Sequence, residues 1–202
     1  MPSPKKQFNI SRIRRALAAV ALLFFGGTVF AQPSPSAERL ALCGACHGAQ
    51  GISVIPQIPS LAGQPKIFIE NQLVLIREGL RDIPAMKGSL DGLKDADLSA
   101  LAKHYQALPP PLAATTPVNA ERFARGKELA RAALCGTCHL PDYSGREQIP
   151  RLAGQQEVFL LESMKQFRDH AGPGRDTIMS ASLYGINNAQ LTDLAHFFAH
   201  FK

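Results

Sequence analysis

Two stretches of this chain are nearly alike: ALCGACHGAQG at Ala41–Gly51 and ALCGTCHLPDYSG at Ala133–Gly145. In both copies two cysteines are separated by two residues and followed directly by a histidine. The chain has four cysteines, and all of them lie in these two motifs: Cys43, Cys46, Cys135 and Cys138. No cysteine is left for a structural disulfide or for an isolated nucleophile, so the cysteine chemistry is confined to these two places.

Three kinds of site use a pair of cysteines at this spacing: a redox dithiol, half of a zinc site and the covalent attachment point of a c-type haem. A thioredoxin-like dithiol follows a strand and has no use for the next histidine, whereas zinc needs four protein ligands. In a haem site the thiols add to the vinyl groups, and His47 or His139 is placed under the iron as the proximal ligand. The complete, repeated motif favours two haem c groups, with zinc and dithiol as the alternatives.

The N-terminus has the features of a secretory signal peptide, residues 1–31. Five basic residues and no acidic residue precede an apolar run from Ala16 to Phe30, and small residues stand before Gln32. The alternative is an uncleaved membrane anchor, but the run is shorter than the ~20 apolar residues that span a bilayer. Cleavage after Ala31 would place the mature protein in the periplasm, where c-type haem is attached.

The net charge of the mature chain argues against nucleic-acid binding. The whole chain has 22 basic and 16 acidic residues, but without residues 1–31 the balance is 17 to 16, a net charge of +1. The propionate groups of two haems would add negative charge. Because no basic cluster with interleaved aromatic residues is present in the mature part, we expect no nucleic-acid partner.

The mature chain divides into two halves that resemble each other. LPPPLAATTPVNA at Leu108–Ala120 has four prolines and no charge, which is typical of a stiff linker between domains. The flanking halves, of about 70 to 85 residues each, are too small to bury a large core without a cofactor. PSLAGQ at Pro59–Gln64 and PRLAGQ at Pro150–Gln155 align at an offset of 91 residues.

The aligned positions also predict helices. Ile69, Leu73 and Ile76 are spaced as one face of an amphipathic helix, and their counterparts in the second half keep that spacing. A last helix is expected in each half, with an Asp in KDADL and an Asn in NNAQL as N-caps. Each half then consists of a helix, the cysteine motif, a helix, a loop with a methionine and a helix. No strand pattern is present, so the predicted fold class is all-α.

The paired CxxCH and PxLAGQ motifs resemble those of the small class I c-type cytochromes and, in tandem, of the dihaem cytochrome c4 family. The resemblance covers about Ala37 to Phe201. It implies two tandem class I cytochrome c domains at residues 32–108 and 119–202, each wrapped around one haem, with a linker at residues 109–118. It also implies that Pro59 and Pro150 accept a hydrogen bond from the proximal histidines, while Leu61 and Leu152 line the haem pockets.

The resemblance further implies that a methionine is the sixth ligand of each iron. Met86 and Met179 occupy equivalent loops, 39 and 40 residues after His47 and His139. Met164 aligns with Leu73 on a helix face and is expected in the core. The other histidines are His104, His170, His196 and His200. His104 and His196 lie on the predicted last helices, where we expect their side chains to be partly exposed. Ligation of iron by one of these histidines, in place of methionine, is the alternative.

The expected function is that of a periplasmic carrier that shuttles single electrons in a respiratory chain, towards a terminal oxidase. An iron with both axial positions filled has no open site for a substrate, so we expect no enzyme activity. The expected partners are redox proteins: an upstream quinol-oxidising complex or dehydrogenase and a downstream oxidase. Peripheral association of the protein with the membrane is compatible with this function. The alternatives are a cytochrome subunit of a periplasmic dehydrogenase and a dihaem peroxidase-like enzyme, which needs a vacant or displaceable ligand.

Overall fold

Helices account for all the regular structure in the part of the chain that the computed structural model describes, residues 34–170 and 174–202. They are α2 (Ala37–His47), α3 (Lys66–Arg77), the 3-10 helix η1 (Pro84–Met86), α4 (Asp95–Ala107), α5 (Ala120–Ala132), α6 (Cys135–His139), α7 (Glu157–Asp169), α8 (Thr177–Ser182) and α9 (Asn188–Ala199). Within these ranges the sole extended pairing is an isolated bridge between Arg146 and Ile149. The all-α prediction is confirmed, while the predicted signal peptide lies outside the described residues.

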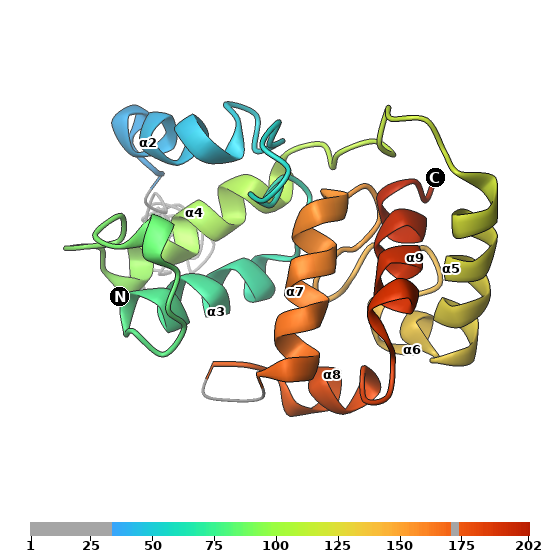
Figure 1. Cartoon of the computed structure of the whole chain (residues 1–202). Helices are drawn as coiled ribbons and strands as arrows, with labels where there is room; N and C mark the ends of the chain where they lie inside the picture. The colour runs from blue at the N-terminus through green and yellow to red at the C-terminus, as the bar shows by residue number, and fades with distance from the viewer. Residues whose placement is uncertain (1–33, 171–173) are drawn as a thin grey trace, which may run out of the picture. The chain divides into compact units, whose positions relative to one another are not determined.

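In the first half α3 packs against α4 (Figure 1). The apolar positions of α3 recur every three to four residues and therefore form one face. That face meets α4 in a buried cluster of Ile69, Leu101, Ala102 and Tyr105, and α2 contributes the partly buried Leu40 and Cys43. The cysteine motif of this half is thus anchored on α4 through a small core.

In the second half α5 lies against α9, and α7 packs on α9 from another side (Figure 1). The core is larger and aromatic, with Phe197 and Phe198 almost completely buried. Gly126 lets α5 approach α9 closely, since a Cβ at this position would lie 2.1 Å from the Asp193 carbonyl oxygen. Arg125 also forms a two-pronged ion pair with Asp193, at 2.7 and 3.0 Å. One glycine and one ion pair therefore fix how α5 packs on α9.

An arginine at equivalent positions, Arg77 and Arg168, binds the start of the last helix in each half. The Arg77 guanidinium donates to the Leu93 carbonyl at 3.1 Å and to the Asp95 carboxylate at 2.7 Å. In the second half Arg168 donates to the Ile186 carbonyl and to the Asn188 side chain, both at 2.8 Å. The sequence match between the two arginines therefore reflects one repeated contact, which joins the second long helix of each half to the start of the last one.

The two last helices begin differently. Asn187 caps α9 as predicted: its side chain accepts the Gln190 N–H, and the Gln190 side chain accepts the Asn187 N–H. The prediction of an Asp N-cap for α4 is wrong, because Lys94 occupies the N-cap position. Asp97, in the first turn, accepts the Lys94 N–H at 2.8 Å instead, so a carboxylate still satisfies a free amide near the positive end of the helix.

The proline-rich segment between the halves is packed rather than free. Ala114 donates its N–H to the Ala199 carbonyl at 2.8 Å and contacts the second core, and Pro111 is buried. The glycines of the two PxLAGQ motifs touch this segment: a Cβ on Gly63 would lie 2.5 Å from Pro110, and one on Gly154 would lie 2.6 Å from the Pro111 carbonyl oxygen. Both have positive φ, 69° and 74°. The repeat keeps glycine here because the linker backbone passes too closely for a side chain.

The two halves contact each other through equivalent residues. Phe68 donates its N–H to the Glu147 carbonyl at 2.9 Å, and Phe159 donates its N–H to the Pro56 carbonyl at 3.0 Å. Phe159 lies 91 residues after Phe68, and Glu147 lies 91 residues after Pro56, so the two contacts are made by equivalent residues with the halves exchanged. Contacts that exchange in this way are characteristic of a two-fold relation, so residues 34–170 and 174–202 contain a pseudo-two-fold axis between the halves.

Candidate functional site

The histidines of both motifs stand at the C-terminal ends of short helical segments, His47 on α2 and His139 on α6. Both side chains are buried, with 9% and 7% of their surface exposed. The Nδ1 atom of each ring lies 2.8 Å from a proline carbonyl oxygen, that of Pro59 for His47 and that of Pro150 for His139. These are the two hydrogen bonds that the family resemblance implies.

The proline contacts determine where each ring carries its proton. A carbonyl oxygen can only accept, so Nδ1 is the protonated nitrogen and Nε2 keeps its lone pair. Within residues 34–170 and 174–202, Nε2 of neither ring is paired in a protein hydrogen bond. Burial lowers the pKa of both histidines, partly opposed by the hydrogen bonds to Pro59 and Pro150. The result is a neutral imidazole with a fixed tautomer and an available nitrogen, the form in which histidine binds a metal.

None of the four cysteines takes part in a disulfide, and the two motifs expose them in the same pattern. Cys43 and Cys135 are half-buried, whereas Cys46 and Cys138 are exposed. Burial raises the pKa of the Cys43 and Cys135 thiols. Each motif therefore places two cysteine side chains beside an imidazole with an available nitrogen. This donor set fits a covalently attached haem, because the chain offers two carbon–sulfur attachment points and one axial nitrogen in each half.

The backbone around the two motifs differs. In the first half α2 runs without a break through the cysteines. In the second half α5 ends at Ala132 and Leu134 takes a left-handed conformation, with φ of 55°, before α6 begins at Cys135. A left-handed non-glycine residue costs about 1–2 kcal/mol. The sequence similarity of the two motifs did not reveal this break, after which the second motif forms a short helix of its own.

The two candidate methionines lie on short helical turns rather than in open loops. Met86 ends η1, and Met179 lies in α8. Asp176 caps α8 and accepts the Met179 N–H at 2.8 Å, which fixes the backbone at that residue. Both side chains are half-buried. Their role as sixth ligands stays a prediction.

Met164 and the two leucines predicted to line the haem pockets lie in or against the hydrophobic cores of the two halves. Met164 is 5% exposed and belongs to the second core, as predicted. Leu61 and Leu152 are half-buried at the edges of the first and second cores. Their N–H groups bind equivalent carbonyls, those of Gly51 at 2.7 Å and Tyr143 at 2.9 Å.

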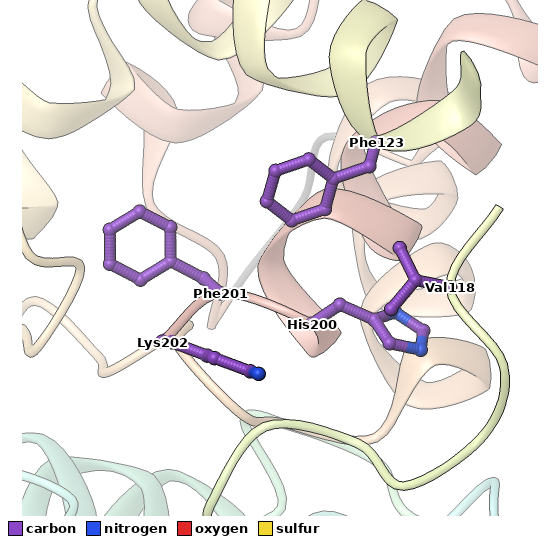
Figure 2. A pocket seen from close by; sticks show the side chains of 5 residues that line it. All are labelled: Val118, Phe123, His200, Phe201 and Lys202. Carbon is purple, nitrogen blue, oxygen red and sulfur yellow. The ribbon is translucent and has the colours of Figure 1, made fainter. Parts of the chain in front are cut away.

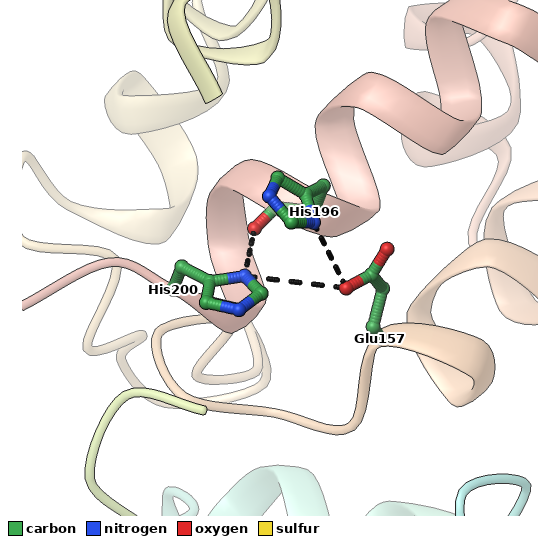
Figure 3. A group of neighbouring side chains, drawn as sticks. All are labelled: Glu157, His196 and His200. Carbon is green, nitrogen blue, oxygen red and sulfur yellow. Dashed lines mark hydrogen bonds and ion pairs between the residues drawn. The ribbon is translucent and has the colours of Figure 1, made fainter. Parts of the chain in front are cut away.

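A second histidine group lies at the C-terminal end of α9, where Glu157, His196 and His200 come together (Figure 3). The expectation that His196 is partly exposed is wrong: 5% of its surface is exposed, and His200 is 3% exposed. His196 Nδ1 lies 3.0 Å from Glu157 Oε2, and its Nε2 accepts the Asn119 N–H at 3.0 Å. Since a backbone N–H needs the Nε2 lone pair, the ring proton is on Nδ1 and points at the carboxylate.

His200 is also fully engaged. Its Nδ1 lies 2.9 Å from the His196 carbonyl oxygen, and its Nε2 lies 3.0 Å from the Thr116 hydroxyl. A metal ion in this group would have to displace several of these hydrogen bonds. The arrangement instead ties the end of α9 to α7 and to the interdomain segment. The sequence held no signal for it, because the three elements meet only in the folded chain.

A pocket of about 300 Å³ opens beside this group (Figure 2). It is lined by Val118, Phe123, His200, Phe201 and Lys202. None of the residues predicted to bind haem lines it. The described part of the chain also contains no helix long and apolar enough to cross a membrane.

Comparison with known proteins agrees with these observations. The cytochrome c family model matches residues 123–202. Cytochrome c4 of Azotobacter vinelandii is 31% identical over 176 residues, which cover 79% of this chain and 84% of the relative. A thiosulfate dehydrogenase electron acceptor of Thiomonas intermedia is 29% identical and covers 84% of this chain and 81% of its own length.

Similarity extends to a solved structure. The crystal structure of reduced recombinant cytochrome c4 from Pseudomonas stutzeri superimposes with a TM-score of 0.75 at 26% sequence identity, covering 84% of this chain and 100% of that one. The tandem class I cytochrome fold predicted from the repeated motifs is confirmed. The chain belongs to the cytochrome c4 family, and it is a dihaem c-type cytochrome that carries electrons on two haem c groups.

Proposed function

We propose that each half holds its haem through its own motif residues. Cys43 and Cys46 form the thioether bonds of haem one and His47 is its proximal ligand; Cys135, Cys138 and His139 do the same for haem two. Met86 and Met179 supply the sixth ligands. The observation that supports this assignment is the repeated pair of buried, neutral imidazoles, each held by a proline carbonyl at 2.8 Å.

This ligand set suits a carrier of single electrons. Haem supplies the one-electron chemistry when bound, and the chain holds and tunes it. With histidine and methionine on the two faces, no position is open for a substrate, and the thioether raises the reduction potential. The Pro59 and Pro150 carbonyls hold the histidine rings in place, so that little reorganisation accompanies electron transfer.

The carrier works in the periplasm after cleavage of residues 1–31. Electrons arrive from a quinol-oxidising complex or a dehydrogenase and leave towards a terminal oxidase of a respiratory chain. The export signal in the sequence and the similarity to cytochrome c4 proteins over most of the chain support this proposal. A peripheral association with the membrane is compatible with it.

A second role is delivery of electrons from a dehydrogenase that acts on inorganic sulfur compounds. The similarity to a thiosulfate dehydrogenase electron acceptor favours it. Mixing the oxidised protein with purified thiosulfate dehydrogenase and thiosulfate distinguishes the two sources of electrons. Rapid reduction of both haems supports this second role; reduction only by a quinol-oxidising complex supports the respiratory role.

The assignment of the motifs predicts a stoichiometry. The mature protein should give two covalently bound haems per chain in a pyridine haemochrome assay, because each CxxCH motif is complete. A variant with both Cys135→Ala and Cys138→Ala should keep one haem, and so should the mirror variant of Cys43 and Cys46. One haem per chain in the unaltered protein would contradict the assignment.

A further inference from the structure

Two glutamines, one from each half, cross the pseudo-two-fold axis and bind the backbone of the opposite half. Gln155 accepts the Ser60 N–H at 2.8 Å and donates to the Ser60 carbonyl at 2.9 Å. Gln64 accepts the Arg151 N–H at 2.9 Å and donates to the Arg151 carbonyl at 3.0 Å. Both glutamines are 4% exposed. We call this reciprocal set of four hydrogen bonds the glutamine clasp.

The clasp reaches the peptide groups that hold the candidate proximal histidines. The Ser60 N–H and the Pro59 carbonyl belong to one peptide group, whose carbonyl oxygen lies 2.8 Å from His47 Nδ1. In the other half the Arg151 N–H and the Pro150 carbonyl form the equivalent group, which holds His139 at 2.8 Å. Each imidazole is therefore joined to a glutamine of the opposite half through a single peptide group.

Hydrogen bonds at the two ends of a peptide group strengthen each other. An acceptor on the N–H draws the amide towards its charge-separated form, which places more negative charge on the carbonyl oxygen. A more basic carbonyl pulls harder on the Nδ1 proton of the histidine and makes Nε2 a stronger donor to the metal. A stronger donor favours ferric iron and lowers the reduction potential of the haem.

We infer that Gln155 tunes the reduction potential of haem one and Gln64 that of haem two, each across the domain interface through the peptide group behind the opposite proximal histidine. Both are positioning residues, since they act on the haem through that peptide group. The inference rests on the proposed role of His47 and His139 as proximal ligands. The potential of each haem then depends on how closely the opposite half is docked.

The test is a pair of mirror variants, Gln155→Met and Gln64→Met, which keep side-chain length but remove the amide. Gln155→Met should favour ferrous haem one by about tenfold, which is ~59 mV for one electron, and should leave haem two nearly unchanged. Gln64→Met should favour ferrous haem two by a similar factor and should leave haem one nearly unchanged. Potentials of the individual haems can be followed through their hyperfine-shifted methyl resonances during a redox titration of the holoprotein. Amide exchange of Ser60 should also accelerate in Gln155→Met.

Gln156 offers a matched control. It is the neighbouring glutamine, and its side chain also crosses the interface, donating to the Ser53 carbonyl. It does not bind the Pro59–Ser60 peptide group. Gln156→Met should therefore weaken the interface without producing the crossed pattern of potentials.

A further variant separates the two hydrogen bonds of Gln155, the one that its side chain accepts and the one that it donates. Gln155→Glu keeps an acceptor for the Ser60 N–H but loses the amide donor, so the potential of haem one should stay at or below that of the unaltered protein. A rise in that variant would overturn the inference. So would equal shifts of both haems, a shift only in the half that carries the substitution, or the same pattern in Gln156→Met. Failure of the proposed ligation would be recognised separately, because the unaltered protein would then lack low-spin histidine–methionine spectra.

Discussion

Replacing Met179 with alanine is expected to remove about half of the methionine-to-iron charge-transfer absorption of the oxidised protein. The thioether of Met179 is the proposed sixth ligand of haem two, and alanine leaves that position open. Without the thioether, which favours ferrous iron, the potential of haem two should fall by an amount on the order of 0.1 V, within the roughly 0.8 V that axial ligands span. Cyanide or carbon monoxide should then bind at one haem per chain, where the unaltered protein resists them.

Two further substitutions serve as comparison. Met86→Ala should have the same effect on haem one. Met164→Leu should leave both haem spectra unchanged, because Met164 is buried in the second core with 5% exposure and leucine conserves its apolar volume. If the unaltered protein already lacks half of the absorption and binds cyanide at one haem, one iron is open and the peroxidase-like alternative replaces the carrier.

Gly126→Ala is expected to lower the free energy of unfolding by about 2–3 kcal/mol. On helix propensity alone this change would stabilise α5 by about 1 kcal/mol. The new methyl group, however, would lie 2.1 Å from the Asp193 carbonyl oxygen and 2.6 Å from Phe197 Cβ. The clash involves backbone, so α5 and α9 must separate and loosen the aromatic core between them.

Denaturant unfolding of the holoprotein measures this effect, followed by circular dichroism and by the haem absorption of the second half. Lys127→Ala is the matched control: the next residue of α5 is exposed, and its truncation should change stability by no more than about 0.5 kcal/mol. A Gly126→Ala variant as stable as the control would show that the two helices are not held at this distance in solution.

Much of this protein could be predicted from local patterns because its function uses residues that are close in sequence. The two thiols and the histidine of each motif need only one helical turn to be brought together, so their spacing alone indicated haem. The spacing of Ile69, Leu73 and Ile76 predicted α3, since one face of a helix must be apolar to be buried. The repeat at an offset of 91 residues likewise predicted two similar halves.

Two predictions about individual residues were wrong. His196 was expected to be partly exposed, but α7 and the interdomain segment cover it, and Glu157 and Asn119 engage its two ring nitrogens. Lys94 stands at the N-cap of α4 instead of the expected Asp, and the Asp97 carboxylate acts from inside the first turn by accepting the Lys94 N–H. At His196 the expected exposure is lost because the fold supplies distant partners, whereas at the start of α4 a local carboxylate caps the helix from a different position.

The fold class, the two cofactors and the repeated motifs follow from the amino-acid sequence, because covalent attachment and helix formation depend on residues within a few positions of one another. How the halves differ and how they contact each other depends on packing in the folded chain. Gly126 has no helical counterpart in the first half, where the position 92 residues earlier is Ser34, before α2 begins. The glutamine clasp joins residues 87 and 95 positions apart, and hydrogen bonds across such separations exist only once both halves have folded and docked.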